Sequence, residues 1–115
     1  MIRITIYKDK NDYIKRYSVS GHANYDEYGR DIVCAAVSVL TQTGLLSINK
    51  VAKIEENQIS YSINQENGFL DVEILEDISL EELKNAQIIL MSLVVGLESI
   101  IDSYPEYVTL EYREV

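Results

Sequence analysis

The alternation of apolar and polar residues at the start of the chain predicts two strands. Residues 2–7 carry an isoleucine at every second position, which is the period of a strand with one buried face. After a short polar turn, residues 13–20 alternate again, and Tyr13, Tyr17 and Val19 carry much of this second pattern. The two segments together predict an opening β-hairpin.

The longest apolar segment of the first half predicts a helix. It begins after Asp31, a residue type that commonly caps helix N-termini, and it runs to about Val51. Gly44 weakens the middle of this helix, because glycine is a poor helix former. The preceding residues 21–30 follow neither the strand period nor the helix period, so we expect a loop there.

The second half of the chain predicts another hairpin and another helix. Residues 58–63 and 69–75 alternate on either side of a polar turn. Ser79 and Glu82 have the spacing of a capping box, which opens a helix. This helix should end near Tyr104, because the proline that follows cannot continue it.

A last alternating segment, residues 107–113, completes the order β-β-α-β-β-α-β. This order predicts an α/β fold of the α+β type, in which two helices cover one face of a mainly antiparallel sheet as a two-layer sandwich. A chain of 115 residues fits one hydrophobic core, so we expect a single domain over residues 1–115.

The second predicted helix is apolar on more than one stripe between Ile88 and Leu97. A helix that lies on a sheet needs only one apolar stripe. Either the helix is packed deeply between the sheet and the first helix, or its outer stripe forms an interface between two copies of the chain. We favour the second explanation and expect a homodimer.

Charge and composition limit the partners that the chain can have. The net charge is −9 at pH 7, which argues against direct nucleic-acid binding, because that binding rests on clustered Lys and Arg. An acidic protein can still attract basic polypeptides. The longest apolar run, Ala86 to Leu97, is interrupted by Gln87 and Ser92 and is shorter than a membrane span. We therefore expect no membrane contact.

The compartment follows from the N-terminus and from cysteine usage. The chain begins with strand-like alternation and has no signal-peptide apolar region. It contains a single cysteine, so no disulfide can form within the chain. Both features predict a cytoplasmic protein.

The single cysteine and the single histidine are the residues most able to carry chemistry. Cys34 is expected in the first turn of the first helix, where free N–H groups and the helix dipole stabilise a thiolate. His22 lies twelve residues earlier, and a loop of that length can fold back to the helix start. The pair therefore suggests a nucleophilic thiolate with a histidine as its base.

Three neighbours can support this pair. Asp31 can cap the helix or orient His22, and capping is the more common role of an aspartate at this position. Ser38 lies one turn after Cys34 on the same helix face. Ala35 is small enough for a substrate to approach closely, and the N–H groups of Cys34 and Ala35 are candidates for binding an oxyanion.

Two other interpretations of these residues stay open. A lone cysteine in an apolar helix is commonly a small buried core residue. A metal site is the second alternative, with Cys34, His22, Asp31 and Asp26 as ligands. Their spacing matches no common zinc pattern, so we expect no metal.

The sequence around the two residues closely resembles the signature of the ribosomal-processing cysteine protease family, often called Prp. The resemblance consists of G-H-A, five further residues and then G-R-D-I-V-C-A-A-V-S, over residues 21–38. The chain length and the order of elements are also similar to those of that family. Through this resemblance, Cys34 corresponds to the catalytic nucleophile and His22 to the catalytic histidine, whereas Asp31 and Ser38 match motif positions whose roles are less defined.

The resemblance also implies a substrate and an assembly. Members of that family remove a short N-terminal extension from a bacterial large-subunit ribosomal protein, the one numbered twenty-seven, as part of ribosome maturation. They cut after an aromatic residue, act as homodimers and need no metal or organic cofactor. The alternative is a non-enzymatic module that binds a ribosomal protein or an assembly intermediate.

A basic ribosomal precursor gives the loop before Cys34 a possible role. The loop residues assigned to substrate contact or to a closing lid are Gly21, Ala23, Tyr25, Asp26, Glu27, Tyr28 and Gly29. The acidic side chains can meet the basic residues after the cut, and the tyrosines can stack on aromatic residues before it. With glycines at both ends, residues 23–30 can close over a bound peptide and bring His22 to Cys34.

Overall fold

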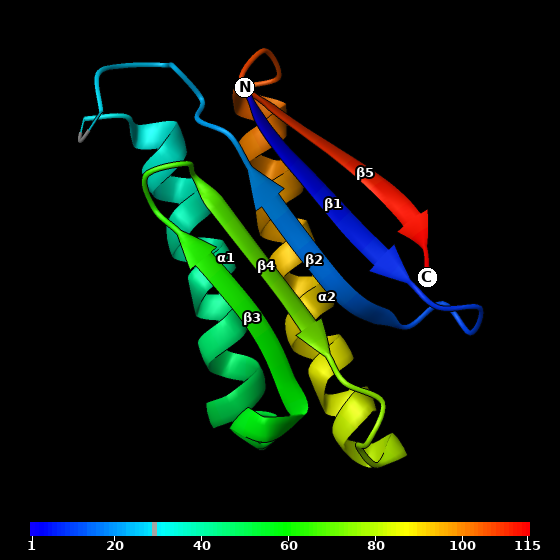
Figure 1. Cartoon of the computed structure of the whole chain (residues 1–115). Coiled ribbons are helices and arrows are strands. Elements are labelled where there is room, and N and C mark those ends of the chain that lie inside the picture. The colour runs from blue at the N-terminus through cyan, green and yellow to red at the C-terminus, as the bar shows by residue number, and fades with distance from the viewer. Residues whose placement is uncertain (29) are drawn as a thin grey trace.

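The computed structural model describes residues 1–28 and 30–115. Within them, one five-stranded sheet is covered on one face by two α-helices (Figure 1). The elements are β1 (Ile2–Lys8), β2 (Ile14–Ser20), α1 (Ile32–Lys50), η1 (Glu56–Gln58, a 3₁₀ helix), β3 (Ile59–Asn64), β4 (Phe69–Ile74), α2 (Leu80–Ser103) and β5 (Val108–Glu114). The predicted fold class is confirmed, and η1 is the one described element that the sequence pattern did not predict.

The strand order of the sheet is β3-β4-β2-β1-β5. All neighbours are antiparallel except β1 and β5, which run parallel. Because β4 pairs with β2, the end of β2 lies beside the start of β4, with Val19 opposite Leu70. The β3–β4 turn therefore sits at the same end of the sheet as the loop between β2 and α1 (Figure 1).

The pattern of β2 differs from the prediction at its first residue. Ile14 is buried in place of Tyr13, which precedes the strand and is only partly covered. The cause is an irregular register, in which Tyr7 pairs with Arg16 but the next residue of β1, Lys8, pairs with Ile14. This extra residue in β2 turns Ile14 toward the core.

A buried glutamine on α2 compensates for this irregularity. The side-chain amide of Gln87 accepts a hydrogen bond from the backbone N–H of Ile14 at 2.6 Å and donates one to the carbonyl of Ile14 at 2.9 Å. Both backbone groups of Ile14 are thereby satisfied at the point where the ladder changes register. The polar residue that interrupts the apolar run of α2 thus ties that helix to β2.

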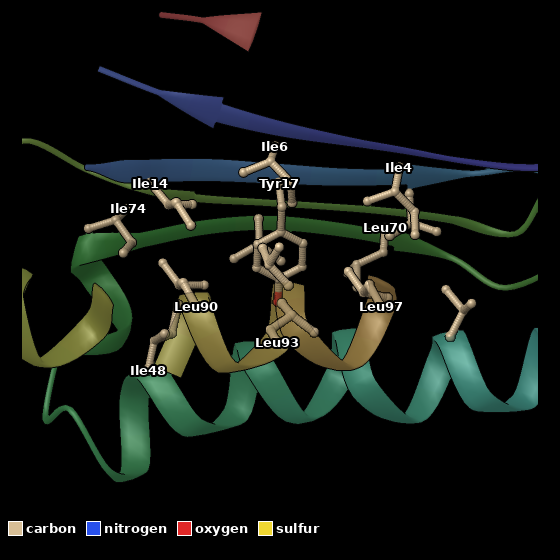
Figure 2. Packing of buried hydrophobic residues seen from close by; sticks show 14 of the residues in the cluster. Ile4, Ile6, Ile14, Tyr17, Ile48, Leu70, Ile74, Leu90, Leu93 and Leu97 are labelled. Atoms are coloured by element: carbon tan, nitrogen blue, oxygen red, sulfur yellow. The ribbon is translucent and has the colours of Figure 1, made fainter. Parts of the chain in front are cut away.

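The core lies between the sheet and both helices, as Figure 2 shows. The ring of Tyr17 reaches from β2 to α1, and its hydroxyl donates to the carbonyl of Thr41 at 2.7 Å. A Cβ at Gly44 would come within 3.0 Å of this hydroxyl. Gly44 therefore makes room for Tyr17, and α1 continues through it without a break.

Both helices are more apolar than we expected. Each contains a window with a mean hydropathy of 1.6, long and apolar enough to cross a membrane by length and composition. The expectation that no segment reaches that length is therefore wrong. Each helix nevertheless packs one row of side chains against the sheet, in the hydrophobic core (Figure 2). This packing accounts for much of the apolar composition of the helices.

The second stripe of α2 faces outward. Ile88, Met91 and Val95 are 69%, 60% and 67% exposed. Deep packing between the sheet and α1 therefore does not explain why these three residues are apolar. On α1, Val39 and Leu46 are also exposed, so the outer surface of the helical layer is apolar on both helices.

Candidate active site

A cleft of about 510 Å³ opens at the end of the sheet where β2 stops and α1 begins. Cys34 and His22 both line it. Its apolar walls include Val19, Val37 and Leu70, which come from β2, α1 and β4. The structure thus brings the two candidate residues to one concave and largely apolar site, which is the usual setting of an enzyme active site.

Cys34 is the third residue of α1, as the capping position of Asp31 predicted. The thiol is half-buried. Its sulfur accepts a hydrogen bond from the backbone N–H of Ala23 at 3.2 Å. The loop therefore folds back onto the helix start and directs a backbone donor at the sulfur.

The position of Cys34 at the helix start does not lower its pKa. Burial raises the pKa of the thiol, and the negative charge of Asp31 raises it further, against the opposing effect of the N–H groups of Ala23 and Asn24. Our expectation of a stabilised thiolate is therefore wrong for the free protein. The main physical reason is burial of the thiol, and the negative charge of the capping Asp31 carboxylate adds to it.

Asp31 uses both oxygens of its carboxylate. Oδ1 accepts from the backbone N–H groups of Val33 and Cys34, each at 3.0 Å. Oδ2 accepts from those of Tyr25 at 2.9 Å and Asp26 at 3.3 Å. Asp31 thus caps α1 and holds the preceding loop against it, which assigns it the capping role rather than the orientation of His22.

The N–H groups that we considered for an oxyanion are already engaged. The N–H of Cys34 donates to the Asp31 carboxylate, and that of Ala35 donates to the Asp31 carbonyl at 3.0 Å. The N–H of Ala23, which points at the sulfur, comes from the loop instead. A hydrogen-bond donor for an oxyanion beside Cys34 is therefore available from the loop rather than from the first turn of α1.

Substitution of Asp31 should separate its two structural roles. Burial acts to raise the pKa of Asp31, but its four N–H donors outweigh burial and lower the pKa. Its stabilisation is therefore present above the ordinary aspartate value of about 3.9 and is lost as pH falls through the lowered value. We expect Asp31→Ala to cost about 0.5–2 kcal/mol at neutral pH, as loss of a helix cap does, and urea unfolding at several pH values measures this.

The matched variant is Asp31→Asn, which keeps one acceptor oxygen for the helix cap and loses the second. Its stability should fall by less than that of Asp31→Ala, because the helix cap is kept, while the amides of Tyr25 and Asp26 lose their acceptor and exchange faster with solvent. Equal exchange at these two amides in wild type and Asp31→Asn would show that Oδ2 does not hold the loop.

His22 directly follows Gly21 at the end of β2. Its Nε2 atom lies 2.8 Å from the backbone carbonyl oxygen of Glu66, in the β3–β4 turn. Its ring also meets the ring of Tyr28 edge-on, with 6.0 Å between centroids. Within the described part of the chain, His22 and Cys34 are not hydrogen-bonded to each other, although they share the cleft.

Some of the other loop residues line the cleft, and others pack the loop against the rest of the protein. Asp26 and Tyr28 line the cleft, together with Ala35 and Ser38 of α1. Ala23 is buried, and its backbone N–H donates to the sulfur of Cys34.

Three of the described residues assigned to substrate contact or to the lid do not line the cleft: Ala23, Tyr25 and Glu27. Glu27 is exposed beside it. Tyr25 packs edge-on against Tyr104 and Tyr107, with ring centroids 5.4 and 5.2 Å apart, so its ring is used to anchor the loop. The expectation for Gly29 lies outside the described residues.

The sequence did not predict that the β3–β4 hairpin borders the site. Ile63, Gln65, Gly68 and Phe69 all line the cleft. The hairpin itself was expected, but its position depends on the pairing of β4 with β2, which the periodicity of the strands does not reveal. The signal available in the sequence was the polar turn with its glycine, and that signal is shared by many hairpins.

The alternative of a metal site has no geometric support. Among residues 1–28 and 30–115, no group of three or more His, Cys, Asp or Glu side chains is arranged to hold a metal ion. The carboxylate oxygens of Asp31 accept backbone hydrogen bonds instead.

Comparison with known proteins points to one family. A family model described as cysteine protease Prp matches residues 1–109. The ribosomal processing cysteine protease Prp of Bacillus subtilis is 28% identical over 106 residues, which is 92% of each chain. The protein of the same name from Staphylococcus aureus is 26% identical over 113 residues, which is 98% of this chain and 100% of the relative.

Solved structures agree with these matches. The structure of the essential ribosomal processing protease Prp of S. aureus with a covalently linked product peptide has a TM-score of 0.85 and 26% identity, and it covers 98% of this chain and 100% of its own. The structure of the same protease with a substrate peptide has a TM-score of 0.79 and 25% identity over the same coverage.

Proposed function

The chain belongs to the cysteine protease Prp family, and on this premise we propose that it is an endopeptidase with Cys34 as nucleophile and His22 as base. The observation that carries the assignment is that these two residues, the single cysteine and the single histidine, line one cleft although they come from different elements. The related protease of S. aureus binds a product peptide covalently, which is the behaviour of an enzyme with a nucleophile.

The reaction that this pair supports is acyl transfer. His22 takes the proton of the Cys34 thiol, and the sulfur attacks the scissile carbonyl carbon. The carbon–nitrogen bond then breaks, and His22 returns the proton to the leaving amine. Water, deprotonated by His22, hydrolyses the thioester and restores the thiol. No step needs a metal or an organic cofactor.

The raised pKa of Cys34 determines when the thiolate forms. In the free protein, burial and the Asp31 charge raise the pKa of the thiol and so oppose its ionisation. We infer that the proton moves to His22 only when a peptide fills the cleft and excludes water, since the loop is already held at the start of α1 through Ala23, Tyr25 and Asp26. The N–H of Ala23, 3.2 Å from the sulfur, then lies closest to the oxyanion that develops on the attacked carbonyl.

We propose that the substrate is the precursor of the bacterial large-subunit ribosomal protein numbered twenty-seven, cut after an aromatic residue. Both named relatives are ribosomal processing proteases. The apolar walls formed by Val37, Ile63 and Leu70 fit an aromatic side chain before the cut. The chain's net charge of −9 favours attraction of a basic ribosomal protein. Asp26 lines the cleft, which supports a contact with basic residues after the cut. A ribosomal substrate is consistent with a cytoplasmic enzyme.

The decisive experiment incubates the purified chain with that precursor and determines the new N-terminus by mass spectrometry. One cut after the aromatic residue is expected. The matched control is a precursor whose aromatic residue before the cut is replaced by alanine, and this control should be cleaved much more slowly. A chain that binds the precursor but leaves it intact would favour the alternative of a non-enzymatic binding module.

We also propose that the chain acts as a homodimer through the outer face of its helical layer. Exposed Ile88, Met91 and Val95 on α2 supply the apolar surface that such an interface needs. Light scattering should give the mass of two chains for wild type and of one chain for Val95→Asp. Tyr112→Asp, which introduces the same charge at an aromatic residue that is 50% exposed on β5, should stay dimeric. A monomeric wild-type chain would contradict this proposal.

A further inference from the structure

We propose that the β3–β4 turn supplies the third member of the catalytic site. In this proposal the backbone carbonyl of Glu66 holds His22 in one tautomer, and Gly68 lets the turn come close enough to do so. The inference rests on the proposed role of His22 as base and adds the group that orients it. Neither residue belongs to the sequence signature around Cys34.

The bond between His22 and Glu66 has only one possible direction. A carbonyl oxygen accepts hydrogen bonds and cannot donate them. The 2.8 Å contact therefore requires a proton on Nε2 of His22. In the neutral ring the other nitrogen, Nδ1, then carries the lone pair, and a general base needs that lone pair to take the thiol proton.

The carboxylate that could have performed this task is not available. Both oxygens of Asp31 accept backbone N–H groups, from the first turn of α1 and from the loop. In a Ser-His-Asp triad a carboxylate fixes the histidine tautomer. Here a backbone carbonyl would perform that task at the other ring nitrogen, Nε2, so that Nδ1 is left as the base. Because the acceptor is a main-chain oxygen, it does not depend on the side chain at residue 66.

The turn that carries this carbonyl is held by its own hydrogen bonds. The N–H of Gly68 donates to the carbonyl of Gln65 at 3.2 Å, which closes the turn around Glu66. The N–H of Asn67 donates to Oδ1 of Asn64, also at 3.2 Å. These bonds occupy other groups of the turn and leave the Glu66 carbonyl directed at His22.

Gly68 is the point at which the turn touches the backbone beside His22. Its φ is +61°, in the left-handed region that favours glycine. A Cβ at this position would collide with the carbonyl oxygen of Gly21 and would lie 3.1 Å from Cε1 of His22. Any side chain at position 68 must therefore push the β3–β4 turn away from Gly21 and His22. The carbonyl of Glu66 would move with the turn.

The test begins with the tautomer of His22 in the wild-type protein. Because the chain has a single histidine, the imidazole nitrogens of a ¹⁵N-labelled sample need no assignment. At about pH 8.5, where imidazole is ordinarily neutral, the spectrum should show a protonated Nε2 and an unprotonated Nδ1. A protonated Nδ1 would overturn the proposal, whether or not the chain cleaves its substrate.

The variant test compares neighbouring positions in the turn. In Gly68→Ala the displaced carbonyl should leave a mixture of tautomers, and kcat should fall about 10- to 100-fold, by analogy with the groups that orient metal-ligating histidines. Asn67→Ala, which changes a side chain outside the cleft, should keep the wild-type tautomer and kcat. Glu66→Ala keeps the carbonyl and should keep the tautomer.

The possible outcomes separate this proposal from the proposed function. A wild-type tautomer in Gly68→Ala, or a lost tautomer in Glu66→Ala, would show that the carbonyl does not orient His22. If Gly68→Ala fails to fold, a protonated Nδ1 in the wild-type spectrum or a changed tautomer in Glu66→Ala would still overturn the proposal. Loss of protease activity on changing Cys34 tests the catalytic assignment independently, because it does not depend on the tautomer of His22.

Discussion

Replacement of Cys34 by alanine should abolish cleavage of the ribosomal precursor. Without the sulfur the protein has no nucleophile at the cleft, and no thioester can form. We expect the rate to fall at least about 10⁴-fold, as when a nucleophile is removed from a protease. The measurement is the rate of appearance of the mature N-terminus, followed by mass spectrometry.

The fold should survive this substitution, so the loss can be assigned to chemistry. Cys34 is small and half-buried, and its sulfur is only a weak acceptor for the Ala23 N–H. The unfolding midpoint and the affinity for the precursor should both stay close to wild type. Ser47→Ala, on the same helix but outside the cleft, is the matched control and should cleave normally. A Cys34→Ala protein that still cuts the precursor would disprove the catalytic assignment.

Replacement of His22 by alanine should have the second-largest effect. Loss of a general base costs about 10²- to 10⁴-fold. Without His22, the thiolate can form only by direct loss of the proton to solvent. Because burial and the Asp31 charge raise the pKa of Cys34, the residual activity should keep increasing with pH beyond the ordinary thiol value of about 8.5. The pH dependence of kcat for wild type and variant measures this.

A second substitution separates proton transfer from positioning at His22. Glutamine is neutral and can donate to the Glu66 carbonyl, but it cannot accept a proton in the relevant pH range. His22→Gln should therefore be about as inactive as His22→Ala. Near-normal activity at neutral pH in His22→Gln would mean that His22 only fills space and donates a hydrogen bond.

Much of the fold could be predicted because its strands and helices have strong periodic patterns. The isoleucines of β1 and the Ser79–Glu82 capping box define elements that the structure reproduces. The failure at Tyr13 has a physical cause, since the shift in register in β2 depends on its pairing with β1 and on the support of Gln87. Such a contact between residues far apart in sequence leaves no local pattern.

The candidate site could be predicted only in part. Cys34 at the helix start and Asp31 as its cap follow from local rules, and the structure has both. The raised pKa of Cys34 did not follow, because it depends on burial and on the direction in which the Asp31 carboxylate faces. The contact of His22 with Glu66 was hidden as well, since it involves a main-chain oxygen 44 positions away.

The protonated state of the resting thiol affects which reagents can reach this enzyme. Peroxides and small electrophiles react with thiolates, so we expect slow oxidation of Cys34 while the cleft is empty, because burial and Asp31 raise the pKa of its thiol. An inhibitor that consists of a reactive group alone would also react slowly with the protonated thiol. A covalent inhibitor would need a peptide-like part that occupies the cleft and activates the sulfur, and its selectivity over other cellular thiols would come from that requirement.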